Sequence, residues 1–94
     1  MPELSDQDRG AIAAAVQAIQ QTTKLTADGK LYCERFAGWL LKSNGKARRM
    51  YAPKRPRCPF PLAQGQWLRR RVVDELRREL SNDGRRLDID GITL

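Results

Sequence analysis

Four prolines lie within nine residues in the middle of this chain: Pro53, Pro56, Pro59 and Pro61. A proline inside a helix removes a backbone hydrogen bond and clashes with the preceding turn, and proline is also excluded from central strands. Neither a helix nor a central strand can therefore run through residues 53–61. We predict an extended segment and loop over residues 46–61, which separates the helical parts of a single domain spanning residues 1–94.

The first helix is predicted over residues 6–22. Ser5 is a favourable N-cap, and an aspartate in the first turn, such as Asp6, suits the positive end of the helix dipole. Ile12, Val16 and Ile19 recur at helical spacing and form one apolar face. This pattern is typical of a helix that packs against a core.

The second helix is predicted over residues 30–43, after a connector at 23–29 that ends in the turn signal Asp28-Gly29. Its wide apolar arc, which includes Phe36, Trp39 and Leu40, predicts that it forms the centre of the core. An alternative is a hairpin that pairs strands 38–43 and 46–51 around Asn44-Gly45. We favour the helix because the aromatic residues follow a period of 3.6 and break a period of two.

The third helix is predicted over residues 62–81, ending at Asn82-Asp83-Gly84. Its apolar stripe consists of Leu68, Val72, Val73, Leu76 and Leu80. On the opposite face we expect three ion pairs at a spacing of four residues: Arg70–Asp74, Arg71–Glu75 and Asp74–Arg78. The tail, residues 86–94, alternates briefly and predicts a short strand or hairpin. The predicted fold class is mainly α, a small three-helix domain, or α+β if the tail pairs with itself.

The charge of the chain is concentrated in its centre. The sequence has 18 basic and 11 acidic residues, a net charge of +7. Residues 35–73 contain 11 of the basic residues and none of the acidic ones. Such a run cannot be neutralised from within, and its field attracts anions. The alternative is a solvated basic face that serves solubility, although solubility is better served by interspersed charges.

Two parts of this basic centre are candidate binding sites for nucleic acid or an acidic partner. The first is the proline-rich loop, whose cations could each neutralise a phosphate: Arg48, Arg49, Lys54, Arg55 and Arg57. The alternative is a mobile solvated loop. The second site is the start of the third helix, where Trp67 shares a face with Arg70 and Arg71. Trp67 either stacks on a base or turns into the core.

No catalytic residue, metal site or cofactor is predicted. The chain has no histidine, no phosphate-binding loop and no carboxylate in its basic centre. Cys33 and Cys58 lack the spacing of a zinc site. We expect Cys33 to be a core residue and both thiols to be reduced, with a disulfide between them as the alternative for an exported protein.

The sequence therefore predicts a binding protein and not an enzyme. Its favoured partner is a polyanion, with nucleic acid first, bound by a small regulator. The alternative is a protein–protein inhibitor or adaptor of the phage or mobile-element type that docks its basic face on an acidic protein surface. The acidic, polar N-terminus and the absence of a long apolar stretch predict a cytoplasmic location without a membrane span.

Overall fold

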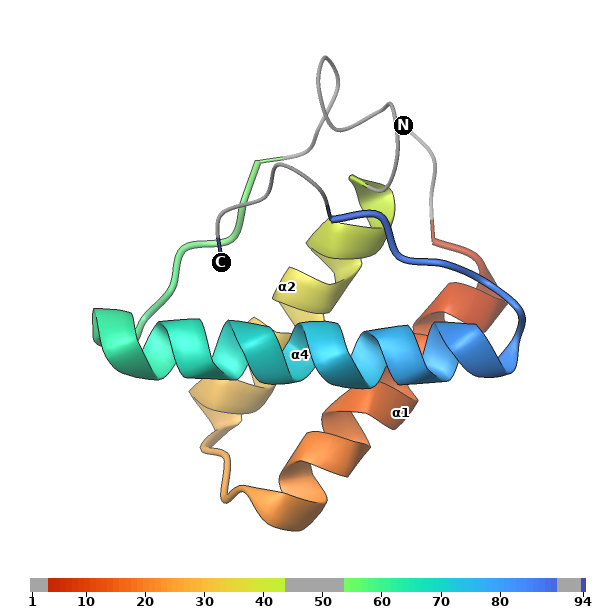
Figure 1. The fold of residues 1–94 in the computed structure, drawn as a ribbon. Helices are drawn as coiled ribbons and strands as arrows, with labels where there is room; N and C mark the ends of the chain where they lie inside the picture. Colours follow the sequence, from red (N-terminus) through yellow and green to blue (C-terminus); the bar gives the residue numbers. More distant parts are fainter. Residues whose placement is uncertain (1–3, 44–53, 90–93) are drawn as a thin grey trace.

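The computed structural model describes residues 4–43, 54–89 and 94. It contains three helices, α1 (Asp6–Thr22), α2 (Ala27–Lys42) and α4 (Leu62–Asn82). Helix α4 crosses in front of α1 and α2 in Figure 1, and each helix packs against the other two. The predicted mainly α, three-helix fold is confirmed.

Helix α1 has the predicted bounds. Ser5 is extended, and its hydroxyl accepts a hydrogen bond of 3.1 Å from the backbone N–H of Asp8. This bond satisfies one of the N–H groups that a helix start leaves without a partner. The predicted apolar face is buried, with Ile12, Val16 and Ile19 all in the core.

Helix α2 begins three residues earlier than predicted. Thr26 is its N-cap, and the Thr26 hydroxyl accepts a 3.1 Å hydrogen bond from the N–H of Gly29. Asp28-Gly29 is therefore not a turn but part of the first helical turn, where Asp28 suits the helix dipole. Gly29 is buried in this turn, next to the Phe60 ring: a Cβ atom at this position would lie 3.5 Å from the ring. The hairpin alternative is wrong for residues 38–43, since α2 continues to Lys42; residues 46–51 lie outside the described residues.

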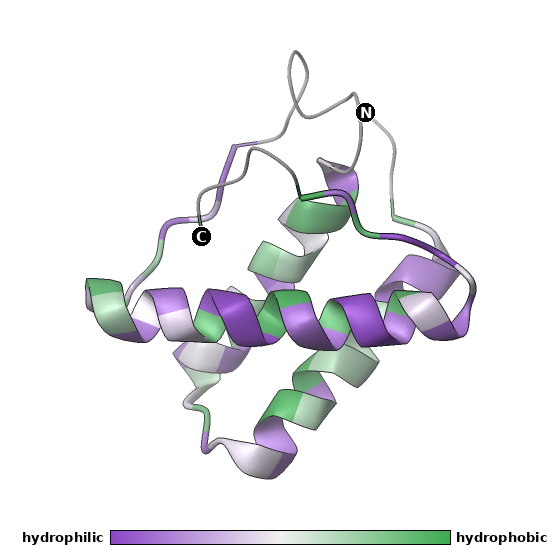
Figure 2. Cartoon of the chain, in the orientation of Figure 1, coloured by the Kyte–Doolittle hydropathy of each residue, from purple (hydrophilic) through white to green (hydrophobic). Residues whose placement is uncertain are grey.

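Helix α4 follows its prediction within one residue at its C-terminal end. It begins after Pro61, whose fixed backbone geometry suits a helix start, and no side chain caps it. It ends at Asn82, and Gly84 has a φ of +73°, a left-handed conformation that favours glycine. The N–H of Arg85 donates to the Leu80 carbonyl oxygen at 2.8 Å and closes the last turn. Figure 2 shows polar and apolar residues alternating along this helix.

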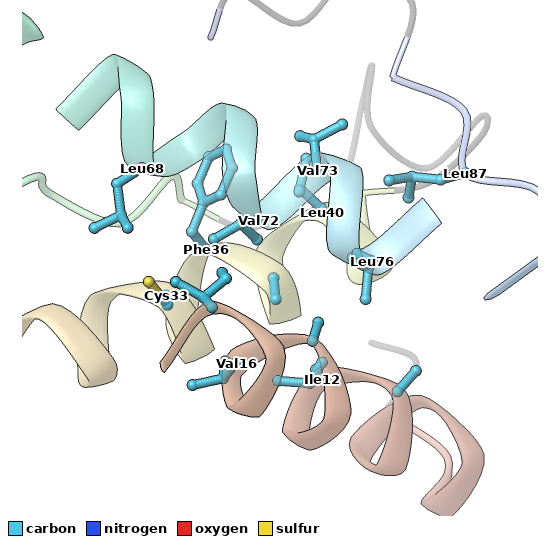
Figure 3. Close-up of a cluster of buried hydrophobic side chains, with 14 of the residues drawn as sticks. Ile12, Val16, Cys33, Phe36, Leu40, Leu68, Val72, Val73, Leu76 and Leu87 are labelled. Carbon is cyan, nitrogen blue, oxygen red and sulfur yellow. The ribbon is translucent and has the colours of Figure 1, made fainter. Parts of the chain in front are cut away.

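The core lies where the three helices meet (Figure 3). Phe36 and Leu40 of α2 are fully buried, as predicted, whereas Trp39 is only partly buried. The predicted apolar stripe of α4 is buried throughout its length: Leu68, Val72, Val73, Leu76 and Leu80. The most extensive pairing is between α1 and α4, so α2 shares the core and does not form its centre.

The described part of the C-terminal tail crosses the domain without forming a strand. Residues 85–89 have no regular structure, and residues 90–93 lie outside the described residues. Leu87 is buried, and Arg85 forms an ion pair with Asp8 near the start of α1. The tail is therefore held by apolar contacts with the core, to which Ile89 and Leu94 also contribute, and by the ion pair of Arg85. The predicted strand is absent from residues 85–89.

Candidate functional site

Among the described residues, most cations of the basic centre remain at the surface. The residues that are exposed and make no ion pair with any carboxylate in the described parts of the chain are Arg35, Lys42, Lys54, Arg57 and Arg70. The acids lie in the two ends of the sequence, and folding brings few of them to these side chains. The three ion pairs observed among the described residues use Arg71, Arg78 and Arg85 instead.

Four of these five cations line one groove. This groove, here called the α2 groove, lies between the outer face of α2 and residues 54–61, here called the proline segment. Its volume is about 740 Å³. The α2 face contributes Arg35 and Lys42, and the proline segment contributes Lys54 and Arg57. Two carboxylates, those of Asp28 and Glu34, also line the groove, and its apolar lining includes Leu31, Trp39, Pro56 and Pro59. The groove therefore combines an excess of positive charge with apolar side chains.

Arg55 lies on the same segment but is directed at the aromatic residues of α2. Its guanidinium carbon is 5.5 Å from the centre of the Trp39 ring and 5.8 Å from that of Phe36. The face of an aromatic ring attracts a cation, so these contacts hold the segment against α2. Arg55 thus has a packing role that its place in a run of cations did not indicate.

Trp67 is exposed on the outer face of α4. Half of its surface is accessible, so the alternative in which it turns into the core is wrong. Arg70, one turn further along the helix, is exposed, and so are Arg77 and Arg78, while Asp74 is the one acid exposed on this part of α4. This face presents an indole beside guanidinium groups, an arrangement suited to stacking and to phosphate contacts.

Arg71 is engaged within the domain. It donates from Nη1 to Glu75 at 3.0 Å and from Nη2 to the Thr22 hydroxyl of α1 at 2.9 Å. Glu75, predicted on the outer face, is only 3% exposed and also lies 3.6 Å from Arg78. Of the three predicted ion pairs, Arg71–Glu75 is confirmed, and the described residues do not form Arg70–Asp74 or Asp74–Arg78. Arg71 therefore ties α4 to the end of α1.

A buried cluster at the start of α4 was missed by the sequence interpretation. Arg69 is only 6% exposed, and its Nη1 donates a 3.3 Å hydrogen bond to the Tyr32 hydroxyl of α2. Burial raises the pKa of Tyr32, and the hydrogen bond from Arg69 partly opposes that effect. Cys58 lies beside this pair, and its thiol donates to the Phe60 carbonyl oxygen at 3.8 Å.

The helical spacing of α4 predicts that Arg69 is buried. Residue 69 follows Leu68 directly and precedes Val72 by three positions and Val73 by four, so it belongs to the buried stripe. A guanidinium in that stripe needs a hydrogen-bond partner within the core, and Tyr32 provides it. The position of Arg69 within a run of three arginines suggests a surface residue, although its place in the helical repeat indicates burial.

The two cysteines occupy different environments. Cys33 is fully buried in the core, as predicted, and Cys58 is partly buried; both are free thiols, not a disulfide. Burial, with a further contribution from Glu34, raises the pKa of the Cys33 thiol to about 11. Cys33 therefore stays protonated at neutral pH.

The structure separates the predicted site residues into distinct surfaces. Lys54 and Arg57 line the α2 groove, whereas Trp67, Arg70 and Arg71 are absent from its lining and belong to α4. Arg48 and Arg49 lie outside the described residues. Arg35 and Lys42, which were not predicted as site residues, join the groove because the proline segment packs along the α2 face that carries them.

No protein-family model, curated protein or solved structure matches the chain. Within the described ranges, no three histidine, cysteine or carboxylate side chains are grouped so that they could hold a metal ion. None of the described helices combines the length and the apolar character that a membrane crossing needs.

Proposed function

We propose that this chain is a non-enzymatic binding protein that engages a polyanion, with nucleic acid as the favoured partner. One observation carries the proposal: five cations from residues 35–73 are exposed and lack ion pairs with described carboxylates. Their charge is available to a ligand because no carboxylate among the described residues forms an ion pair with them. Four of them line the α2 groove, and the fifth, Arg70, lies one turn from the exposed Trp67.

Phosphate contacts explain why such a surface favours nucleic acid. Each phosphate neutralised by a lysine or arginine releases condensed counterions, which supplies most of the sequence-independent affinity. An exposed indole adds stacking on an unpaired base, worth about 1–3 kcal/mol per base. The α2 groove supplies the phosphate contacts in this proposal, and the α4 face supplies Trp67 and Arg70. A location in the cytoplasm, where nucleic acid is available and thiols stay reduced, agrees with the two free cysteines.

Fluorescence anisotropy with labelled single-stranded DNA, duplex DNA and RNA, each at two salt concentrations, tests this proposal. The informative variant is Lys54→Glu with Arg57→Glu. Because both residues are exposed, the fold should be retained, since such substitutions change stability by less than about 0.5 kcal/mol. Affinity should fall, and the slope of log K against log salt should decrease by about 0.9 per lost phosphate contact on duplex DNA.

A matched control is available at the acidic end of the chain. Arg9→Glu with Lys24→Glu makes the same change in net charge at two exposed positions of the N-terminal half. If the groove is the binding site, this control should weaken binding far less than the Lys54 and Arg57 variant. Equal losses would mean that net charge alone drives association. No affinity for any of the nucleic acids at low salt would overturn the proposal.

A second candidate function is docking on an acidic surface of another protein, as an inhibitor or adaptor. The observation in its favour is the exposure of three large apolar side chains: Leu31, Leu62 and Trp67. Leu31 lies in the groove with the cations. Exposed apolar side chains are more useful to a protein interface than to phosphate contacts. Failure of the anisotropy test would leave this function as the one to pursue.

A further inference from the structure

The α2 groove changes its charge along its length. Asp28, Arg35 and Lys42 follow one another at intervals of about two helical turns, so they form one row on the face of α2 that lines the groove. Asp28 is in the first turn of α2, and Lys42 is its last residue. Lys42 follows Asp28 by 14 positions, so at a rise of about 1.5 Å per residue the row is about 21 Å long. One end of this face is therefore acidic and the other is basic.

The proline segment, the other wall of the groove, runs antiparallel to α2. The guanidinium of Arg55 lies over the Trp39 ring, toward the C-terminal end of α2. The Phe60 ring lies next to Gly29, in the first turn of the helix. Lys54 directly precedes Arg55 and therefore lies toward the basic end of the α2 row. Each wall of the groove thus has a lysine at the same end.

The two carboxylates of the groove, Asp28 and Glu34, both belong to the N-terminal half of α2. Asp28 is exposed, Glu34 is partly exposed, and neither forms an ion pair with a described cation, so both can accept hydrogen bonds from a ligand. A phosphate offers only acceptors and is repelled here, whereas an N–H group of a base can donate. Leu31 and Pro59 add apolar lining beside them. This end of the groove therefore suits a base and not a phosphate.

We propose, as a refinement that rests on the proposed function, that the α2 groove binds single-stranded nucleic acid with phosphates at its basic end and an unpaired guanine at its acidic end. Guanine presents two N–H donors side by side on its Watson–Crick edge, and one carboxylate can accept both hydrogen bonds. In a duplex this edge is paired with cytosine, so only an unpaired guanine offers it. Thymine and uracil carry a carbonyl oxygen on each side of their single N–H, and these oxygens repel a carboxylate.

Fluorescence anisotropy with single-stranded DNA of one length tests the base preference. The strands are thymine throughout, or carry guanine or hypoxanthine, which lacks the amino group, at the central position. The guanine strand should bind about fivefold or more tightly than the thymine strand, the lower end of what a bidentate base contact discriminates, and the hypoxanthine strand should lie between them. In duplexes the guanine preference should vanish. Equal binding of the guanine and thymine strands would overturn the refinement alone, whereas no binding of any strand or duplex would overturn the proposed function as well.

Two variants assign the preference to the carboxylates. Asp28→Asn with Glu34→Gln should lose most of the guanine preference, although all strands should bind more tightly because the net charge rises. Asp74→Asn with Glu79→Gln is the matched control: it makes the same change on α4, outside the groove lining, at one exposed and one partly exposed position, and should keep the preference. Circular dichroism checks that both variants fold. An undiminished guanine preference in the Asp28 and Glu34 variant would overturn the role of the acidic end.

Discussion

Two helical glycines differ only in what surrounds them. Gly10 on α1 is exposed, and a Cβ atom there would meet nothing within 4 Å. Gly65 on α4 is buried, and a Cβ atom there would lie within 3 Å of both Cys58 and Arg69. A glycine within a helix costs about 1 kcal/mol of stability relative to alanine. The surroundings of each glycine therefore decide whether its replacement by alanine raises or lowers the stability of the domain.

We therefore predict opposite effects for one change at these two glycines. Gly10→Ala should stabilise the domain by about 0.5–1 kcal/mol, because it lowers the entropy of the unfolded chain without a clash. Gly65→Ala should destabilise it by about 1–3 kcal/mol, the usual cost of overpacking a core. Urea unfolding followed by circular dichroism measures both. Stabilisation by Gly65→Ala would show that Cys58 and Arg69 can move aside.

The buried thiol of Cys33 makes stability depend on alkaline pH. Its pKa rises on folding from an ordinary value of 9.0 to about 11, so the folded state favours the protonated thiol. The resulting stabilisation is complete below about pH 9 and is lost as pH rises to about 11, a loss of about 2 kcal/mol. Unfolding experiments on the parent and Cys33→Ala across this range should show a steeper decline for the parent. Parallel curves would contradict the prediction.

At the scale of the helices, local signals predicted two of the three elements well. Ser5 fixed the start of α1, Pro61 that of α4, and Gly84 the end of α4, because each has a backbone or side-chain property that a helix terminus requires. The start of α2 was misplaced because Asp28-Gly29 resembles a turn in isolation. Only the fold shows that Gly29 is buried against Phe60, a contact between residues far apart in the sequence.

The candidate site was predictable to a smaller extent. The exposure of Lys54 and Arg57 agrees with the acid-free run, since no neighbouring carboxylate could neutralise them. The grouping of these residues with Arg35 and Lys42 depends on how the proline segment packs on α2, which charge alone does not determine. Three consecutive arginines also differ: Arg69 is buried, Arg70 is exposed and Arg71 is paired with Glu75, according to their positions around α4.

The corrected start of α2 has a direct test in its N-cap. Thr26→Ala removes the acceptor for the Gly29 N–H and should cost about 1 kcal/mol of stability. Thr26→Asp keeps an acceptor at the same place and should retain the stability. Thermal unfolding distinguishes the two variants. If Thr26→Ala has no effect, the helix starts nearer residue 30, as the sequence alone suggested.

At the scale of the whole molecule, stability depends on a small shared core. Phe36 is fully buried, stacks between Tyr32 and Trp39, and lies beside α4 residues in Figure 3. Phe36→Ala should cost about 3–5 kcal/mol, which approaches the total stability of a domain of this size. Leu31→Ala, at an exposed position of the same helix, is the control and should change stability little. Normal thermal stability of Phe36→Ala would contradict this placement of the core.

The hydrogen bond between Arg69 and Tyr32 has a consequence for the alignment of the helices. The apolar stripe of α4 repeats at Leu68, Val72, Leu76 and Leu80, so a helix that slipped by one turn would still bury a continuous row of aliphatic side chains. Dispersion and burial alone would distinguish such registers poorly. Arg69 breaks the repeat, because a slipped α4 would carry its charge away from the Tyr32 hydroxyl and leave both groups buried without a partner. A permanent charge inside the domain thus selects one register among several that the aliphatic residues would accept.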